Sequence, residues 1–129
     1  MDREDLTRRD HERGQASIQT LIVWPVVLLF VFVLVQGGLW FLGRNAAFAA
    51  AQEGARAAAA ERGTVGAGTS AAQSFLATST VGLSQVSITG SRTAAEATIT
   101  VSASAVSLVP GFDPTVVQTV ALPVERITG

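Results

Sequence analysis

A long uncharged stretch near the N-terminus limits what this chain can fold into. No charged residue lies between Arg13 and Arg44, and Leu21 to Val35 is apolar at every position. The apolar character resumes at Leu39 to Leu42, after the interruption Gln36–Gly38. A bilayer core requires about 20 mostly apolar residues in a helix, whereas a soluble protein would need a large surrounding domain to bury such a helix. The stretch therefore predicts one membrane-spanning helix.

A cleaved secretory signal is the main alternative for such a stretch. The apolar region of a signal peptide covers only about 7–15 residues, and a small-residue cleavage site follows it. Here the apolar region is longer, and the next segment, Arg44 to Arg62, is rich in Ala and favours a helix rather than a break. We therefore expect the membrane helix to be retained.

The distribution of arginine indicates the direction in which the helix crosses the membrane. Four arginines precede the stretch and three follow it within about 20 residues, the range that counts for orientation: Arg3, Arg8, Arg9 and Arg13, then Arg44, Arg56 and Arg62. Cytoplasmic segments carry the excess of positive residues. We therefore expect a single-pass protein of the cytoplasmic (inner) membrane with a cytoplasmic N-terminus. In this prediction residues 1–14 are a charged leader, residues 15–43 the transmembrane helix and residues 44–129 an extracytoplasmic module.

Pro25 lies near the start of the span. It predicts a kink, because Pro inside a helix removes one backbone hydrogen bond; a kink without functional meaning is the simpler interpretation. Trp24 and Trp40 lie near the two ends of the span, where amphipathic aromatic side chains prefer the membrane interface.

Two helices are expected outside the membrane. The Ala-rich segment should extend the membrane helix, giving one helix from about Ser17 to Arg62 that stops at Gly63. Its small side chains suit close packing against a helix or a sheet, although a simple composition bias would produce the same pattern. After a turn-rich break, Thr69 to Ala77 predicts a short helix that Thr69 or Ser70 caps. Its apolar face would carry Ala72, Phe75 and Leu76.

The remaining sequence alternates with a period of two, which is typical of strands. Ser84 to Thr89 predicts a first strand that a Gly90–Ser91 turn would end. Ala95 to Ala105 alternates apolar and polar residues most regularly, and Val116 to Ile127 predicts a third strand, in which Pro123 indicates an edge position. Such a small sheet needs an apolar cover. We therefore predict an α+β fold in which the long N-terminal helix continues outward and packs on a small antiparallel sheet.

Residues that carry enzyme chemistry are scarce. The chain has no Cys and a single His, His11, which excludes disulfides, thiolate metal sites and a histidine-based triad. The acids beyond the span are scattered: Glu53, Glu61, Glu96, Asp113 and Glu125. A net charge of −1 gives no basic surface for nucleic acid. We predict a protein that is not an enzyme and has no metal, no cofactor, no small-molecule substrate and no nucleic-acid partner.

Three segments in order carry a resemblance to a known family. They are Arg13–Gln19, Pro25 within the apolar stretch, and Glu53–Ala58 after it. Together they resemble the TadE-like family, pseudopilin-like proteins of tight-adherence (Flp, type IVb) pilus systems. The resemblance implies a pilin-like fold and a structural role in pilus assembly, secretion or cell adhesion. It also implies pilin-like or pilus-assembly partners and a prepilin peptidase.

The same resemblance nominates positions near the cytoplasmic end of the helix. Gly14 would be the residue after which the peptidase cleaves, and Gln15 would be the new N-terminus. Pilin-like proteins usually carry Glu five residues after that Gly, and here the position is Gln19. A Glu there can pair with the free amine of a neighbouring subunit, whereas a neutral Gln can only form hydrogen bonds. Gln19 is therefore either an altered assembly residue or simply a polar residue at the membrane edge.

Two classes of function remain open at this point. The chain is either a pseudopilin-like structural component that acts through its helix, or a membrane-anchored extracytoplasmic module that binds a protein through its sheet and has no part in a pilus.

Overall fold

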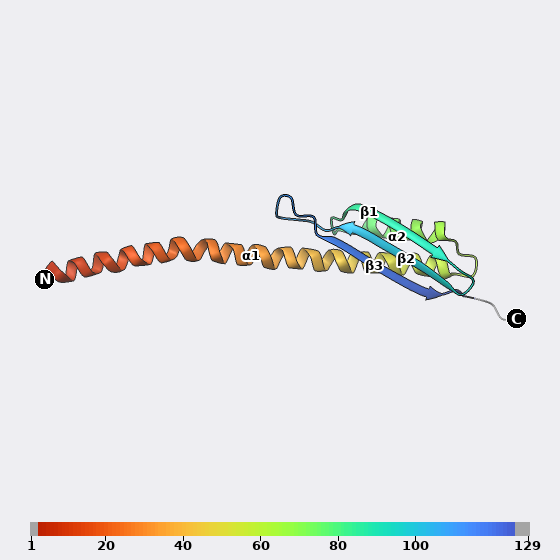
Figure 1. The fold of residues 1–129 in the computed structure, drawn as a ribbon, viewed down its shortest axis with the longest axis horizontal. Coiled ribbons are helices and arrows are strands. Elements are labelled where there is room, and N and C mark those ends of the chain that lie inside the picture. Colours follow the sequence, from red (N-terminus) through yellow and green to blue (C-terminus); the bar gives the residue numbers. More distant parts are fainter. Residues whose placement is uncertain (1–2, 126–129) are drawn as a thin grey trace. The chain divides into compact units, whose positions relative to one another are not determined.

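The computed structural model describes residues 3–125, with the side chains of residues 4–13 left out. It contains two helices and three strands (Figure 1): α1 (Arg3–Ala59), α2 (Val65–Thr78), β1 (Ser84–Arg92), β2 (Glu96–Ser104) and β3 (Thr115–Pro123). The chain divides into two compact units, Met1–Val35 and Gln36–Gly129, and α1 contributes to both. The predicted α+β class is confirmed.

The N-terminal unit is the first part of α1. The helix begins at Arg3 rather than near Ser17, so the predicted helix start was wrong. The leader contains Arg, Glu and Leu, which are good helix formers and allow the helix to extend through it. Pro25 lies inside α1 without interrupting it.

The C-terminal unit contains one antiparallel sheet with the strand order β1-β2-β3. β2 is the central strand: Val101 lies opposite Ile88 on β1 and Gln118 on β3. The alternation of β2 is confirmed, and β3 is an edge strand that ends at Pro123. The predicted extension of the third strand includes Ile127, which lies outside the described residues.

The predicted turn at Gly90 and Ser91 was wrong, because both residues lie within β1. The hairpin turns instead at Thr93, whose backbone amide donates to the carbonyl of Glu96 at 2.8 Å and whose hydroxyl accepts from the Glu96 amide at 3.1 Å. Gly90 allows a close approach across the sheet, since a Cβ there would lie 2.7 Å from Cδ1 of Ile99. A glycine that makes room for a neighbour looks in the sequence like a turn glycine.

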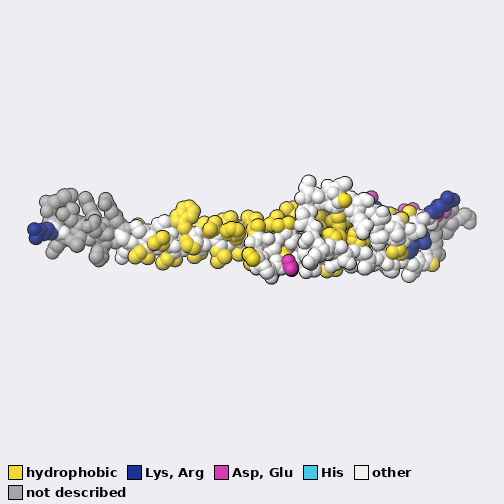
Figure 2. All heavy atoms as spheres, turned by 90° about the horizontal axis from the view of Figure 1, so that it is seen from above, with side chains coloured by type: hydrophobic (Ala, Val, Ile, Leu, Met, Phe, Trp, Pro, Cys, Tyr) yellow, Lys and Arg dark blue, Asp and Glu magenta, His cyan; other side chains and the backbone are white. Residues whose placement is uncertain are grey.

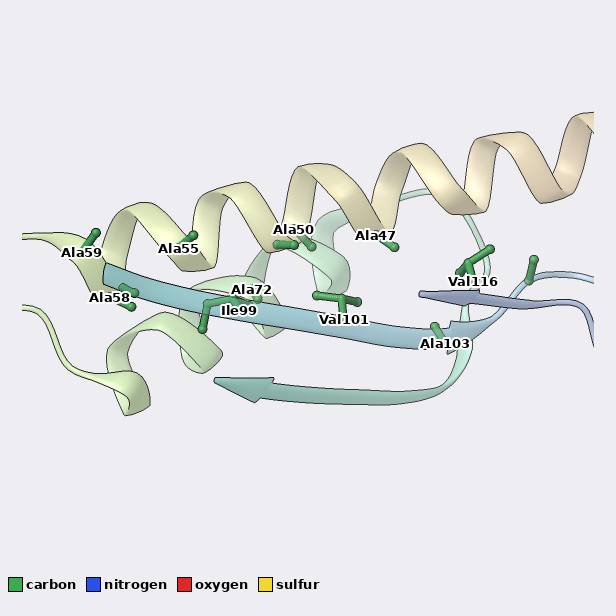
Figure 3. Packing of buried hydrophobic residues seen from close by; sticks show 13 residues of the cluster. Ala47, Ala50, Ala55, Ala58, Ala59, Ala72, Ile99, Val101, Ala103 and Val116 are labelled. Atoms are coloured by element: carbon green, nitrogen blue, oxygen red, sulfur yellow. The ribbon is translucent and has the colours of Figure 1, made fainter. Parts of the chain in front are cut away.

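The core lies between one face of the sheet and both helices (Figure 3), and it is built mainly from alanine. Ile99 and Val101 on β2 and Val116 on β3 are its largest fully buried side chains. Alanines of α1 and α2 cover them: Ala47, Ala50, Ala51, Ala55, Ala58, Ala59 and Ala72. The close-packing role predicted for the Ala-rich segment is therefore confirmed, because such small side chains let the helix backbones approach the sheet closely.

α2 begins earlier than the sequence suggested. The hydroxyl of Thr64 accepts from the Ala67 amide at 3.0 Å and caps the helix, so the predicted cap at Thr69 or Ser70 was wrong. Glycines in the first turn hid this start, because they resemble a loop. The buried residues of α2 are Gly68 and Ala72, whereas Phe75 is 37% exposed and does not lie in the core.

The end of α1 is held by the sheet. Arg92 on β1 donates from Nε to the carbonyl of Ala58 at 2.9 Å and from Nη2 to that of Ala60 at 3.4 Å. The amide of Glu125 donates to the carbonyl of Ala59 at 2.8 Å. These contacts satisfy helix-end carbonyls that would otherwise lack partners. α1 ends at Ala59 rather than Arg62, and the predicted stop at Gly63 follows within one turn.

Candidate membrane and assembly site

The residues nominated for processing and assembly lie on the exposed surface of α1. Gly14, Gln15 and Gln19 are all exposed, and a Cβ on Gly14 would meet no atom within 4 Å. Gln15 and Gln19 are four residues apart, which places them on the same side of the helix. Among the residues that the structure describes, neither glutamine side chain forms a hydrogen bond.

The apolar part of the N-terminal unit is uncovered. The most apolar 18 residues of the candidate membrane span have a mean hydropathy of 2.7, and none of them is buried. Figure 2 shows hydrophobic side chains gathered along this part of the molecule. Large side chains such as Leu21 and Phe30 are 73% and 63% exposed. A helix with this much exposed apolar surface suits lipid or the apolar helices of partners, and water poorly.

In the C-terminal unit, the side chain of Gln36 joins α1 to a distant loop. Its Nε2 donates to the carbonyl of Val106 at 3.0 Å, and its Oε1 accepts from the amide of Leu108 at 2.8 Å. Both polar atoms of the Gln36 side chain therefore form hydrogen bonds with the loop backbone, as the backbone of a neighbouring strand would. From the sequence, Gln36 was only an interruption of the apolar stretch, and an isolated polar residue in such a stretch was the one available indication of a contact.

That loop connects β2 to β3 and closes through a tight turn. Pro110 and Gly111 occupy the turn, Gly111 has a φ of +80°, and the Phe112 amide donates to the carbonyl of Val109 at 3.2 Å. Pro followed by a residue of positive φ is the pattern of a type II turn. The hydroxyl of Ser107 donates to the Val109 carbonyl at 2.9 Å and accepts from the Val109 amide at 3.2 Å. Several backbone groups of the loop thus find partners within the protein.

The surface around Gln36 is mostly apolar. An open groove of about 500 Å³ separates α1 from the start of β3, and its lining residues are Gln36, Gly37, Trp40, Phe112, Asp113, Pro114 and Thr115. Val109 and Phe112 are 53% and 50% exposed. One turn after Trp40, the guanidinium of Arg44 lies 5.6 Å from the centre of the indole ring.

Groups suited to catalysis do not gather anywhere in the described part of the chain. Among those residues no cluster of His, Cys, Asp and Glu could hold a metal ion. Glu53 and Arg56 form a surface ion pair at 3.8 Å within α1, which adds local support to the helix. A smaller hollow of about 280 Å³ has no ionisable residue in its lining: Gln73, Leu76, Ala77, Val81, Leu83 and Val86.

Comparison with known protein families gives a match in the N-terminal half of the chain. Residues 14–56 match the family model described as TadE-like protein. The match covers the apolar helix and most of the Ala-rich segment, and it confirms the resemblance drawn from the sequence. No curated protein and no solved structure matches the chain.

Proposed function

Because residues 14–56 carry a TadE-like segment, we propose that the chain is a pseudopilin-like structural component of a tight-adherence (Flp, type IVb) pilus or a related secretion machine. The observation that carries this proposal is the coincidence of the family match with the exposed apolar helix. TadE-like proteins are structural rather than enzymatic, which agrees with the scattered ionisable groups of this chain.

The proposal assigns a place to each part of the chain. Residues 1–14 lie in the cytoplasm, residues 15–43 cross the inner membrane and residues 44–129 form the extracytoplasmic module. The excess of arginine ahead of the span supports this direction. The module is compact, since the sheet and both helices share one core.

Assembly would proceed through α1 after a prepilin peptidase cuts between Gly14 and Gln15. The cut would remove every charge that precedes the span, so that the helix is no longer held at the cytoplasmic surface and can join the helices of pilin-like partners. Gly14 lies immediately after Arg13 and just before the uncharged stretch, where a membrane-embedded peptidase can reach it from the cytoplasmic face.

Gln19 would then give a weaker contact than the usual Glu. The new amine at Gln15 carries a charge, and a neutral amide offers it a hydrogen bond without charge pairing. We propose that this chain joins an assembly at a position where strong pairing with a neighbour is unnecessary, such as its tip or its base, rather than as the repeated subunit.

Photocrosslinking in native membranes tests the role. A benzophenone amino acid at Phe30, on the apolar helix, should form adducts with pilin-like or pilus-assembly proteins, because that surface is free to contact other helices. The control places the same amino acid at Ser91, which is exposed on β1. Adducts that form at Ser91 alone would favour the alternative, an anchored binding module without a part in a pilus.

A further inference from the structure

The loop between β2 and β3 lies beside the part of α1 that leaves the membrane. Gln36 contacts it, one helical turn before Trp40 and two turns before Arg44. Arg44 is the first charged residue after the span and lies over the Trp40 ring. An aromatic ring paired with an Arg is typical of the membrane interface. At 1.5 Å per residue, Gln36 lies roughly 12 Å deeper than Arg44 along the helix.

The loop presents apolar side chains at this level. No charged residue occurs from Ala105 to Phe112, and the exposed apolar residues are Val106, Leu108, Val109 and Phe112. On α1, one turn after Gln36, the side chain of Trp40 is 38% exposed. Trp40 and Phe112 line the same groove, so the loop adds to the apolar surface at this end of α1.

Part of the loop backbone finds hydrogen-bond partners within the protein, which suits a position at the membrane interface. A backbone amide or carbonyl in hydrocarbon needs a partner within the protein, whereas a loop in water needs none. Here Gln36 pairs with Val106 and Leu108, while Ser107 pairs with both polar groups of Val109. The same contacts satisfy the Gln36 amide, which would be costly to leave unpaired inside the span.

We propose that the apolar part of the loop, residues 106–112, inserts into the outer interface of the bilayer and seats the module against the membrane, with Gln36 as the residue that positions it. Lipid is the occupant because the loop shares a groove with Gln36, Gly37 and Trp40, which belong to the residues 15–43 that cross the membrane in the proposed function. The proposal rests on the membrane anchoring within the proposed function and is independent of any role in a pilus.

The absence of native Cys makes a direct test practical. The full chain carrying Val109→Cys is labelled with the fluorophore NBD and reconstituted into phosphatidylcholine–phosphatidylglycerol vesicles. The control is Ser91→Cys, which is exposed on β1. We expect blue-shifted emission and quenching by nitroxide-labelled lipids for the probe at 109, and quenching by aqueous iodide for the probe at 91. Equal iodide quenching at both positions would overturn the proposal.

Two further measurements test what surrounds the loop and which residue positions it. If a second copy covers the loop, the blue shift at 109 will fade as the protein is diluted in lipid, and that result also overturns the proposal. Adding Gln36→Leu removes both hydrogen bonds without adding charge, so the emission at 109 should return toward the red. Emission unchanged by Gln36→Leu would show that Gln36 does not position the loop. Failed assembly into a pilus would affect neither result, because the vesicles contain this chain alone.

Discussion

Glycine serves two different purposes within fifteen residues of this chain. Gly54 and Gly68 bring α1 and α2 together: a Cβ on Gly54 would lie 2.7 Å from the carbonyl oxygen of Gly68, and one on Gly68 would lie 2.7 Å from Cβ of Ala58. Gly63 allows the chain to leave α1, because a Cβ there would collide with the carbonyls of Ala57 and Ala58. Gly66, near the start of α2, meets only the Thr64 hydroxyl at 3.8 Å.

Replacing Gly68 with Ala should separate the two helices. Its new methyl group would meet backbone on α1 and Cδ1 of Ile99 at 3.0 Å, and overpacking of this kind costs about 1–3 kcal/mol. The matched control is Gly66→Ala in the same helix, which should be neutral or stabilising by less than about 1 kcal/mol. Denaturant unfolding of the full chain in detergent, followed by circular dichroism, measures both. Equal stability of the two variants would contradict the close helix contact.

Of the roles of Gly54, Gly63 and Gly90, the sequence predicted only that of Gly63. Gly63 was predictable because it follows a long run of helix formers. The roles of Gly54 and Gly90 were not predictable, because they depend on Gly68 and Ile99, which lie on neighbouring elements and come close only in the fold. A residue without a side chain carries no indication of what lies opposite it.

At the scale of single elements, β2 is the strand on which the module depends. It pairs with a neighbour on each side, and its buried residues face alanines of both helices. Its other face carries Thr100, whose hydroxyl lies 3.0 Å from that of Thr119 on β3. β2 was predictable because its side chains alternate between a covered and an open face.

Val101→Asp should unfold the module in large part. The side chain is 0% exposed, and a carboxylate placed there without a partner should cost more than about 3 kcal/mol. Thr89→Asp is the control: Thr89 is exposed on β1 and lies opposite Thr100 on the open face. Limited proteolysis compares the two variants. Similar cleavage rates would show that the assignment of the two faces is wrong.

The two helices were less predictable than β2. The end of α1 depends on its contacts with Arg92 of the sheet, which no local pattern reveals. Phe75 was expected in the core because it is large and apolar, but Gly68 and Ala72 take the contact with α1 and leave Phe75 outside. Where a core is built from small residues, size is a poor guide to burial.

For the whole molecule, we predict that the C-terminal module lies outside the cytoplasm. An alkaline phosphatase reporter fused after Gly129 should be active, because the proposed topology places the C-terminal module outside the cytoplasm. A β-galactosidase fusion at the same position is the control and should be inactive. Active β-galactosidase with inactive phosphatase would reverse the proposed topology.

The candidate processing and assembly residues could be named from the sequence, whereas the contact between α1 and the loop could not. Gly14, Gln15 and Gln19 came from the resemblance, and the family match begins at the first of them. The contact of Gln36 with Val106 and Leu108 joins residues about 70 positions apart, and the separation in sequence hid it.

The mass of the intact protein shows whether this chain is processed as a pseudopilin-like protein. The chain is purified from its native membrane, from cells with and without an active prepilin peptidase. Gly14→Leu is the variant designed to resist cleavage. Its side chain would enter open space on α1, so the fold should be unchanged. A leucine at 14 should block the cut, since Gly lets a protease approach the backbone closely.

We predict a mature chain that begins at Gln15 when the peptidase is active, and a chain that retains residues 1–14 in the Gly14→Leu variant or without the peptidase. Recovery of the wild-type chain with residues 1–14 still attached, in cells whose peptidase processes other substrates, would show that the chain is not processed as a pseudopilin-like protein.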